Sequence, residues 1–554
     1  MKKTQDAEEP GTKKTTAGAQ PAVIRRLLIE RYRGIKKLDW WPDPGLNVIL
    51  GAGDVRKTTI LDAIALLLSP SNAIVITDTD FWCRNLEADF SIRAIISLPL
   101  DSGINTQPTM VGPWDWNGKT AVAPTLPEDG APSPALQSPV YKVMVRGTPE
   151  LDLTYEIVQP HGISISFSPN LRRAIGVVRL GGDDRNDRDL RLVQGSSLDR
   201  LLADKTLRSR LGVEFSKDDV TGELQEDGQT ALKALDESLS NQSLPHALGL
   251  GLNLGQGQSV SALIGLTSNS LGFRLPLTNW GAGTRRLTSL AVAQSCRTGS
   301  PITLIDEAER GLEPYRQRAL VSTLAQGAAQ VFMTTHSGTV LSAAQPSVVW
   351  HLNSNGNIGK LDPEKTAKHR QRDPEAYLAR LAIICEGATE VGFASHLLRT
   401  KLDDDLAGRG IRLSDGGGHE ICLQLLRELS SAGFVFGGFA DNEGKGEKMW
   451  ATLKGSMGDL LMQWPEGCTE SQVIQNVPED KLEILVEDPE HDLTQPRINT
   501  LIDRIRRGQP DVSFEKHSFN AVKEQAGISH HSFEKMAKYW FWLSSLFSAA
   551  QSCE

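Results

Sequence analysis

Cysteine is scarce in this chain. The sequence has 554 residues and six cysteines, and no two of these form a Cys-x-x-Cys pair. Structural zinc sites and disulfide frameworks both depend on paired or closely spaced cysteines. The sequence therefore indicates neither of them, and we expect a cytoplasmic protein.

Long apolar runs are absent as well. No stretch approaches the ~20 apolar residues that a membrane-spanning helix needs. Residues 1–21 are mostly polar and charged and lack the apolar centre of a signal peptide. We expect a disordered leader at 1–21 and no membrane partner.

An excess of positive charge is also missing. Lys and Arg number 59 against 68 Asp and Glu, which gives a formal net charge of −9. This balance argues against binding nucleic acid over the whole surface, but it leaves room for a local basic groove or a metal-assisted phosphate contact. The content of hydrophobic (39%) and charged (23%) residues is that of a globular protein. The length predicts about two to four domains.

Residues 51–59 read Gly-Ala-Gly-Asp-Val-Arg-Lys-Thr-Thr and resemble a phosphate-binding loop. An apolar run that predicts a strand precedes them, and a helical pattern follows, as the motif requires. In such loops backbone N–H groups cradle the phosphates, the lysine reaches the β/γ oxygens and a hydroxyl binds Mg²⁺. The candidate nucleotide-binding residues here are Gly51, Asp54, Lys57, Thr58 and Thr59, with Thr58 also a Mg²⁺ ligand.

Arg56 departs from this motif, because it stands where the second glycine belongs. Glycine is used there so that the backbone can approach the nucleotide without a Cβ, in some loops at positive φ. Since the flanking strand and helix patterns are intact, we expect Arg56 to weaken or slow ATP turnover without destroying the fold.

An acidic pair and a histidine follow two later apolar runs. Ile302–Ile305 predicts a buried strand that ends in Asp306 and Glu307, and residues 331–335 predict another that ends in His336. An aspartate at a strand end suits Mg²⁺, and the glutamate after it can polarise an attacking water. A histidine in this position can sense a γ-phosphate.

A glycine-containing segment lies shortly before the acidic pair. Gly281, Gly283 and Arg285 stand at a predicted helix start, and such an N-terminus can close on the ATP of a second subunit. In this order and spacing the motifs resemble the ATPase head of the ATP-binding-cassette (ABC) class. The resemblance implies a dimer and an ATPase domain at 22–352, with an inserted helical region at about 185–250 for dimerisation.

A second group of acidic residues lies beyond a polar segment, 353–380, that we interpret as a linker. Glu386 follows a predicted buried strand and Glu390 comes one helical turn later, while Asp441 and Glu443 follow another strand. In an open α/β sheet such strand ends meet at one edge, where ligands bind. Several carboxylates there can hold one or two divalent cations and stabilise the oxygens of a phosphodiester.

This arrangement resembles a Toprim domain, which is Rossmann-like. An ABC-type ATPase followed by Toprim is the layout of the OLD (overcoming lysogenization defect) family of ATP-dependent endonucleases, and the nuclease subunit of the Gabija anti-phage system looks like a relative. The resemblance implies an α/β fold with mixed sheets and a Toprim domain at 381–554, the C-terminus of which looks shortened relative to the family. The metal ligands or catalytic groups that it implies are Glu386, Glu390, Asp441, Glu443 and Glu470. It also implies a lysine that neutralises the scissile phosphate, for which Lys538 (or Lys535) is the candidate.

We therefore expect an ATP-regulated DNA endonuclease, nicking or cutting both strands, that uses Mg²⁺ (or Mn²⁺) in defence against phage or plasmids. We expect a homodimer or homotetramer, with a further defence-system protein or nucleic acid as a candidate partner. The alternative is a nucleotide-sensing scaffold that has lost cleavage and recruits a partner effector. A topoisomerase or primase fits less well, because the ATPase motifs come first and nothing marks a nucleophilic tyrosine.

Overall fold

The computed structural model describes most of the chain. It covers residues 21–537 apart from 52–55, 99–101, 105–110, 125–135, 182–186, 194–195, 203, 205–206, 208–220, 253–263, 271, 296–300, 346, 354, 403–404, 489–491 and 509–517. Within this part of the chain no helix has the length and apolar content to cross a membrane. The chain forms two compact units, one of residues 1–47 and 56–334 and the other of residues 48–55 and 335–554.

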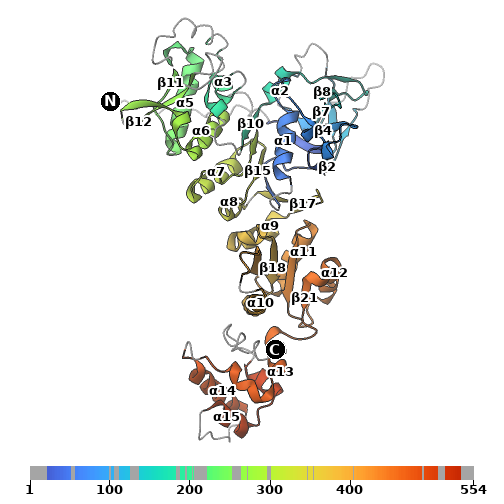
Figure 1. The fold of residues 1–554 in the computed structure, drawn as a ribbon, viewed down its shortest axis with the longest axis vertical. Helices are drawn as coiled ribbons and strands as arrows, with labels where there is room; N and C mark the ends of the chain where they lie inside the picture. The colour runs from blue at the N-terminus through green and yellow to red at the C-terminus, as the bar shows by residue number, and fades with distance from the viewer. Residues whose placement is uncertain are drawn as a thin grey trace, which may run out of the picture. The chain divides into compact units, whose positions relative to one another are not determined.

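An antiparallel sheet dominates the beginning of the first unit (Figure 1). One face is buried, because residues such as Leu27 and Ile29 alternate with more exposed ones along β1. The helix α1 (Lys57–Leu67) contacts β4 and β7. The path runs β2-β1-β4-β7-β5-β6, and β8 and β9 continue from β7. The bounds are β1 Val23–Tyr32, β2 Ile35–Trp40, β4 Phe90–Ser97, β5 Trp114–Trp116, β6 Ala121–Val122, β7 Pro139–Gly147, β8 Leu153–Val158 and β9 Ser164–Ser166.

A second, mainly parallel sheet carries the ATPase motifs. Its strand order begins β10-β14-β15-β3, and β14 is parallel to both of its neighbours. Every residue of β14 and β15 is buried, as is usual for strands covered on both faces. The strands are β3 Leu46–Leu50, β10 Val177–Leu180, β14 Ile302–Ile305 and β15 Val331–Thr334, and the helices near them in sequence are α2 Pro169–Ile175, α6 Ala282–Gln294 and α7 Pro314–Gln326.

Between β10 and α6 the first unit contains short helices and a small antiparallel sheet, β11-β12-β13. Leu232, Leu235 and Leu239 form the buried stripe of α5, with the spacing of an amphipathic helix. The elements are α3 Ser197–Leu202, α5 Glu226–Asn241, β11 Leu248–Leu252, β12 Ile264–Ser270 and β13 Phe273–Pro276. Short 3-10 turns in the first unit are η1 Asp78–Asp80, η2 Trp82–Arg84, η4 Asp187–Leu190, η5 Thr221–Glu223 and η7 Leu277–Asn279.

In the second unit the segment 353–380 forms regular secondary structure, although the sequence predicts a linker there. It contains β17, α9 and the turn η8, and Thr366, His369 and Arg370 of α9 are buried. The sequence does not predict these elements, because the segment is polar and few apolar side chains mark its buried face. The bounds are α8 Gly338–Ala343, β16 Val348–Leu352, β17 Ile358–Leu361, α9 Pro363–Arg372 and η8 Pro374–Tyr377.

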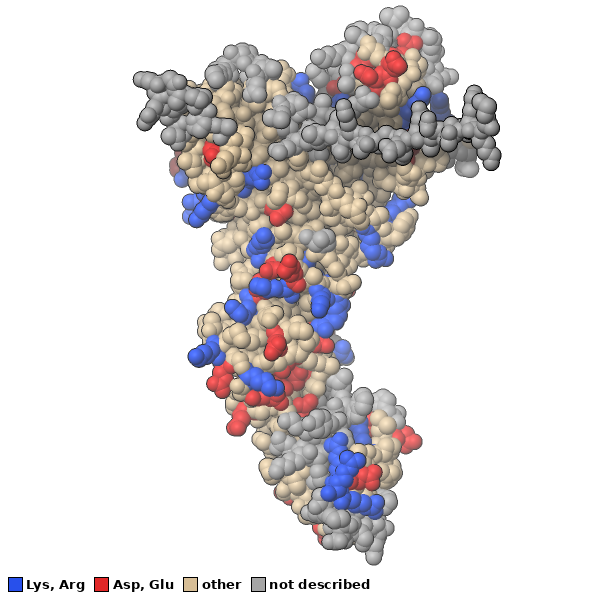
Figure 2. Space-filling model, turned by 180° about the vertical axis from the view of Figure 1, so that it is seen from behind, with Lys and Arg blue, Asp and Glu red and all other residues tan. Residues whose placement is uncertain are grey.

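A four-stranded parallel sheet follows in the order β19-β18-β20-β21. The carboxyl ends of parallel strands lie at one edge, and here the edge receives Glu386 after β18 and Asp441 after β20. Acidic side chains gather on the visible face of this part of the second unit (Figure 2). The bounds are β18 Leu381–Cys385, α10 Ala388–Lys401, β19 Ile411–Asp415, α11 His419–Ser431, β20 Phe436–Ala440, α12 Glu447–Met457, η9 Gly458–Leu460 and β21 Leu461–Gln463.

The described chain ends in a helical group with its own apolar core. Phe519 and Phe533 meet there edge to face, with ring centroids 5.8 Å apart. The buried pair of Arg497 and Asp488 joins α14 to the preceding segment at 2.5 Å. The elements are α13 Thr469–Asn476, η10 Glu479–Leu485, α14 Thr494–Gly508, α15 Phe519–Ala526 and α16 His530–Ala537. Together, the antiparallel and parallel sheets and the helices of the two units confirm the predicted α/β class with mixed sheets.

Candidate functional site

The segment that resembles a phosphate-binding loop lies between β3 and α1, so a strand precedes it and a helix follows it. Gly51 directly follows β3, and Lys57, Thr58 and Thr59 form the first turn of α1. Lys57 is buried, whereas the Thr58 side chain is exposed. Asp54 lies outside the residues that the structure describes.

Arg56 is the residue that caps the N-terminus of α1. Its φ of 72° and ψ of 23° lie in the left-handed region, where a Cβ is unfavourable and glycine is preferred. The guanidinium carbon lies 5.4 Å from the ring centroid of Trp82. The side chain also covers Gly34 so closely that a Cβ added there would lie 2.6 Å from Arg56 Nε. The missing glycine is therefore accommodated by a strained backbone and by packing on Trp82 and Gly34.

Asp306 accepts two hydroxyl groups at the end of β14. Thr334 Oγ1 donates to Asp306 Oδ1 at 2.6 Å, and Thr58 Oγ1 lies 3.3 Å from the same oxygen. A threonine from the first turn of α1 and an aspartate at the end of β14 thus face one point, where they could together hold Mg²⁺. Thr334 was not among the predicted site residues, although its place at the end of a buried strand was a usable signal.

Glu307 has an unusual backbone conformation, with φ at 50°. Its N–H donates to Thr334 Oγ1 at 2.9 Å, and its carboxylate lies 3.4 Å from Arg310. A left-handed residue that is not glycine costs of order 1–3 kcal/mol and is often found at functional sites. The half-exposed carboxylate lies beside Arg310 at the edge of the sheet.

The glycine-containing helix start forms α6, with Gly281 as its N-cap. Gly283 packs so tightly on Gly311 that an added Cβ would lie 2.1 Å from the Gly311 carbonyl oxygen. Arg285 donates to the carbonyl oxygen of Thr278 at 3.1 Å.

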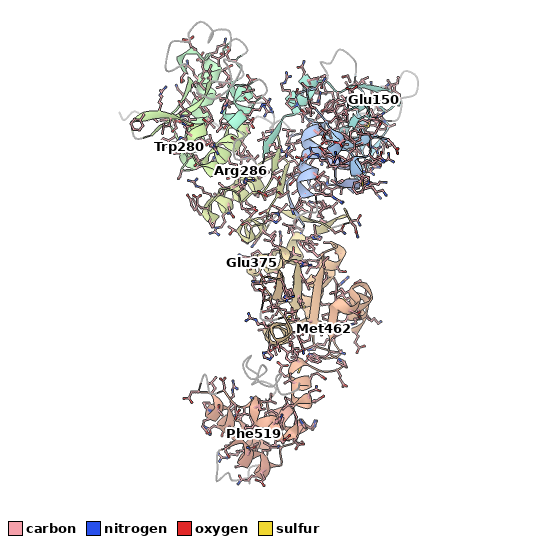
Figure 3. The ribbon with its side chains drawn as sticks, in the orientation of Figure 1. Glu150, Trp280, Arg286, Glu375, Met462 and Phe519 are labelled. Atoms are coloured by element: carbon pink, nitrogen blue, oxygen red, sulfur yellow. The ribbon has the colours of Figure 1, made fainter. Side chains whose placement is uncertain are left out.

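Arg286 is a second residue that the sequence interpretation did not select. Its guanidinium donates to the backbone carbonyl oxygens of Asp306 and Arg310. Arg286 is labelled in Figure 3. Burial lowers the pKa of Arg286, and the nearby Glu309, Asp306 and Glu307 act in the opposite direction. Arg286 thereby fixes α6 to the chain that carries the acidic pair.

His336 is exposed and lies in the short segment that leads from β15 to α8. It belongs to the second unit, as do the residues of the second acidic group. Its predicted role as a γ-phosphate sensor remains a prediction.

In the second acidic group the structure brings Glu386 and Asp441 together. The backbone N–H of Asp441 donates to Glu386 Oε2 at 3.1 Å, and the N–H of Glu386 donates to the Phe439 carbonyl oxygen at 2.8 Å. The Asp441 carboxylate accepts the N–H and the hydroxyl of Thr469, both at 2.9 Å. Thr469 begins α13, so the helix N-terminus supports this carboxylate.

Glu390 lies in the first turn of α10 and is buried. Its Oε2 accepts the N–H of Gly387 at 2.9 Å. Burial, followed by the charge of Asp441, raises the pKa of Glu390 to about 7, and Glu470 adds to the effect. Burial also raises the pKa of Asp441 to about 6, with Glu386 and Glu470 as further causes. Glu386, Glu390, Asp441 and Glu470 thus form one electrostatically coupled cluster, which we call the acidic cluster.

The sequence predicts two further residues for this site, Glu443 and Lys538. Glu443 is exposed and its carboxylate lies 3.0 Å from Lys445 Nζ. Lys538 lies outside the described residues. Among the residues that the structure does describe, no three or more His, Cys, Asp or Glu side chains are arranged so that they could hold a metal ion. Glu390 is buried and Glu386, Asp441 and Glu470 are partly buried, and a cation would relieve the repulsion between carboxylates in such a cluster.

One part of the chain is similar to a known protein family. Residues 140–343 match the model described as "AAA domain, putative AbiEii toxin, Type IV TA system". This span contains the start of α6, the acidic pair and His336, while the phosphate-binding loop precedes it. A search of curated proteins gives no match.

Several solved structures are similar in fold. The Smc head bound to the C-winged helix domain of ScpA has 16% identity and a TM-score of 0.40, over 62% of this chain and 99% of that one. The Smc head of Pyrococcus furiosus has 13% identity and a TM-score of 0.39, over 64% and 100%. The recombination mediator RecF with ATP has 12% identity and a TM-score of 0.37, over 63% and 100%. At these values the likenesses carry no functional argument.

Proposed function

We propose that this chain is an ATP-regulated, divalent-metal-dependent DNA endonuclease of the OLD type, with an ABC-type ATPase domain and a Toprim domain. The observation that carries the nuclease proposal is the contact between Glu386 and the Asp441 backbone N–H at the carboxyl edge of the β18 sheet, with the charge of Asp441 acting on Glu390. The match of residues 140–343 to an AAA domain family supports the ATPase part, and its toxin description supports a place in bacterial defence.

In the ATPase domain, Lys57 and the N-terminus of α1 would bind the phosphates, and Thr58 and Asp306 would hold Mg²⁺. Glu307 would orient the attacking water. The N-terminus of α6, with Gly281, would meet the nucleotide of a partner subunit in a homodimer or homotetramer.

In the nuclease domain, Glu386 and Asp441 would bind Mg²⁺ or Mn²⁺, supported by Glu390 and Glu470. A cation bound there supplies Lewis acidity at the phosphodiester and lowers the pKa of a bound water. The protein residues hold the carboxylates in place, through Thr469 for Asp441 and the Asp441 N–H for Glu386.

The direct test is cleavage of supercoiled plasmid with Mg²⁺ or Mn²⁺, with and without ATP. We expect cleavage by the wild type and a loss of about 100-fold or more in Asp441→Ala, because a ligand and its charge are removed. Asp459→Asn is the matched control, because Asp459 is an exposed acid in the same domain. Absence of cleavage, or equal cleavage by Asp441→Ala, rejects the nuclease proposal.

A second candidate is a nucleotide-sensing scaffold without nuclease activity that recruits a partner. The absence of a metal-binding arrangement among the described residues favours it. ATP binding together with no cleavage under any metal condition would support this candidate.

A further inference from the structure

The antiparallel sheet of the first unit has a cavity of about 380 Å³ on its outer face, which is the face turned away from α1. Ligand-binding pockets of proteins begin at roughly this size, about 300 Å³. Arg26 of β1, Arg93 of β4 and Lys142 of β7 line the cavity, and no Asp or Glu of the described residues does. The cavity is therefore cationic, and the rest of its lining is mainly apolar.

Strand pairing places the three cations on one face. Ile95 pairs with Arg26 on one side and with Lys142 on the other, and residues that pair directly point to the same face of a sheet. Arg93 lies two residues before Ile95 on β4 and shares this face. On the opposite face, Tyr155 Oη donates to a carbonyl oxygen of α1 at 3.2 Å. The cavity is thus separate from the segment that resembles a phosphate-binding loop.

Both arginines keep donors that the protein does not use. Arg26 donates to Asp39 through Nε at 2.8 Å and through Nη2 at 2.7 Å. Arg93 donates to Glu30 through Nη2. In the part of the chain that the structure describes, Nη1 of neither arginine has a hydrogen-bond partner. Each guanidinium can therefore donate to a ligand without breaking its ion pair.

Lys142 has no carboxylate partner among the described residues, and its Nζ lies 3.2 Å from the ring centroid of Trp114. Trp114 is fixed in turn, because its Nε1 donates to the carbonyl oxygen of Val158 at 2.8 Å. Burial, followed by the nearby charge of Arg26, lowers the pKa of Lys142. A bound anion would counteract both effects, since an opposite charge favours the protonated amine.

We propose that this cavity is a phosphate-binding site in which Lys142, Arg26 and Arg93 bind a phosphate group, either of a nucleic acid or of a free phosphorylated compound. A phosphate suits three cations, because it offers several acceptor oxygens to guanidinium N–H groups and to the point charge of a lysine. The formal net charge of the chain is −9, so the cavity is a local exception to its overall charge. The inference goes beyond the proposed function, because it needs neither cleavage nor a metal ion.

The test measures how fast acetic anhydride acetylates Lys142 in the full chain, by mass spectrometry of the digested protein. One arm adds inorganic pyrophosphate and the other adds a DNA oligonucleotide, both at constant ionic strength and with EDTA to prevent metal-dependent cleavage. An adjacent opposite charge changes a pKa by about 1–3, so we expect acetylation to slow roughly tenfold or more in at least one arm. Lys36, an exposed lysine of β2, should react at the same rate throughout.

Two variants test whether the protection comes from the cavity. Arg93→Gln removes a lining cation, whereas Arg146→Gln removes a cation of β7 that does not line the cavity. We expect the probe concentration that half-protects Lys142 to rise roughly tenfold in Arg93→Gln, as for the loss of a charge-assisted hydrogen bond. In Arg146→Gln it should stay within about twofold of the wild type.

The probe that protects Lys142 at the lower concentration identifies the source of the phosphate, and either source supports the proposal. Failure of both probes to protect Lys142, equal protection of Lys36, or equal half-protection in the two variants overturns it. The plasmid-cleavage test does not enter this measurement, so the phosphate site and the proposed nuclease can fail independently.

Discussion

Thr334 Oγ1 donates to Asp306 Oδ1 at 2.6 Å and accepts the N–H of Glu307 at 2.9 Å. A single hydroxyl at the end of β15 therefore orients both members of the acidic pair at the end of β14. Its only proton goes to Asp306, and its lone pair receives the Glu307 amide. The two residues proposed for Mg²⁺ binding and water activation thus depend on a third that neither binds the cation nor attacks.

Replacing Thr334 by Val should remove this support while nearly keeping the volume. The loss of a hydrogen bond in a buried site costs about 1–3 kcal/mol. We expect ATP affinity to change little and kcat for ATP hydrolysis to fall roughly 10–100-fold, as for other residues that orient metal ligands. Steady-state ATPase and nucleotide-binding assays test this. Thr334→Ser keeps the hydroxyl and should retain activity; equal activity of the Val and Ser variants would contradict the role.

Arg56→Gly should relieve the strained N-cap of α1. The left-handed φ of 72° favours glycine by about 1 kcal/mol, but glycine also raises the entropy of the unfolded chain, and the contact with Trp82 is lost. These terms nearly cancel, so we expect the free energy of unfolding to change by no more than about 1 kcal/mol. We expect ATP affinity or turnover to rise. Unchanged binding and turnover would show that Arg56 does not impair the loop.

The packing of Arg56 on Gly34 can be tested by a double-mutant cycle. A Cβ at residue 34 would meet Arg56 Nε, Cδ and Cγ within 3 Å. Gly34→Ala should therefore destabilise the wild type by up to about 1 kcal/mol and should have little effect in Arg56→Gly. Additive effects in urea unfolding would mean that the arginine side chain lies elsewhere in solution.

Sequence reasoning located these sites because each motif depends on local order along the chain. Buried apolar strands that end in charged residues placed Asp306, Glu386 and Asp441 at sheet edges, and parallel pairing brings strand ends to one edge. In the structure the backbone N–H of Asp441 donates to Glu386 Oε2. The contributions of Thr334 and Arg286 could not be predicted in the same way, because each contacts residues that are far away in sequence.

The backbone at Arg56 shows the limit of pattern matching more directly. The motif identified the position as one for glycine, and the left-handed φ agrees with it. Nothing in the pattern indicated that Gly34 and Trp82 would accommodate the side chain. The segment 353–380 shows the opposite case, since its polar composition concealed α9 and a buried histidine.

Gly283→Ala and Gly281→Ala should separate packing from nucleotide contact in α6. An added Cβ at Gly283 would clash with the backbone of Gly311, whereas at Gly281 it meets no atom within 4 Å. We expect Gly283→Ala to lower the free energy of unfolding by about 1–3 kcal/mol and Gly281→Ala to leave it unchanged. Any loss of ATPase activity in Gly281→Ala would then be due to nucleotide contact. Equal stability of the two variants would contradict the close approach to Gly311.

His369 should make the stability of the second unit depend on pH. Its ring lies between Tyr377 Oη at 3.0 Å and Ser414 Oγ at 2.9 Å, and burial, aided by Arg372, lowers its pKa from 6.5 to about 4. Between these values the unfolded chain binds more protons than the folded one. The neutral ring of His369 therefore contributes its full stabilisation above about pH 6.5. As the pH falls toward 4 this stabilisation is lost, and the free energy of unfolding decreases by at most roughly 3 kcal/mol.

The raised pKa values of Glu390 and Asp441 act in the opposite direction, because their folded forms hold protons more tightly than the unfolded chain. The pH dependence of the wild-type stability alone therefore does not isolate the contribution of His369. His369→Gln keeps a polar side chain that does not titrate, so the difference in unfolding free energy between the two proteins should be largest at pH 7 and should shrink by about 2–3 kcal/mol by pH 4.5. Urea unfolding at both pH values measures it. A difference that is independent of pH would mean that the imidazole remains accessible to protons in the folded protein.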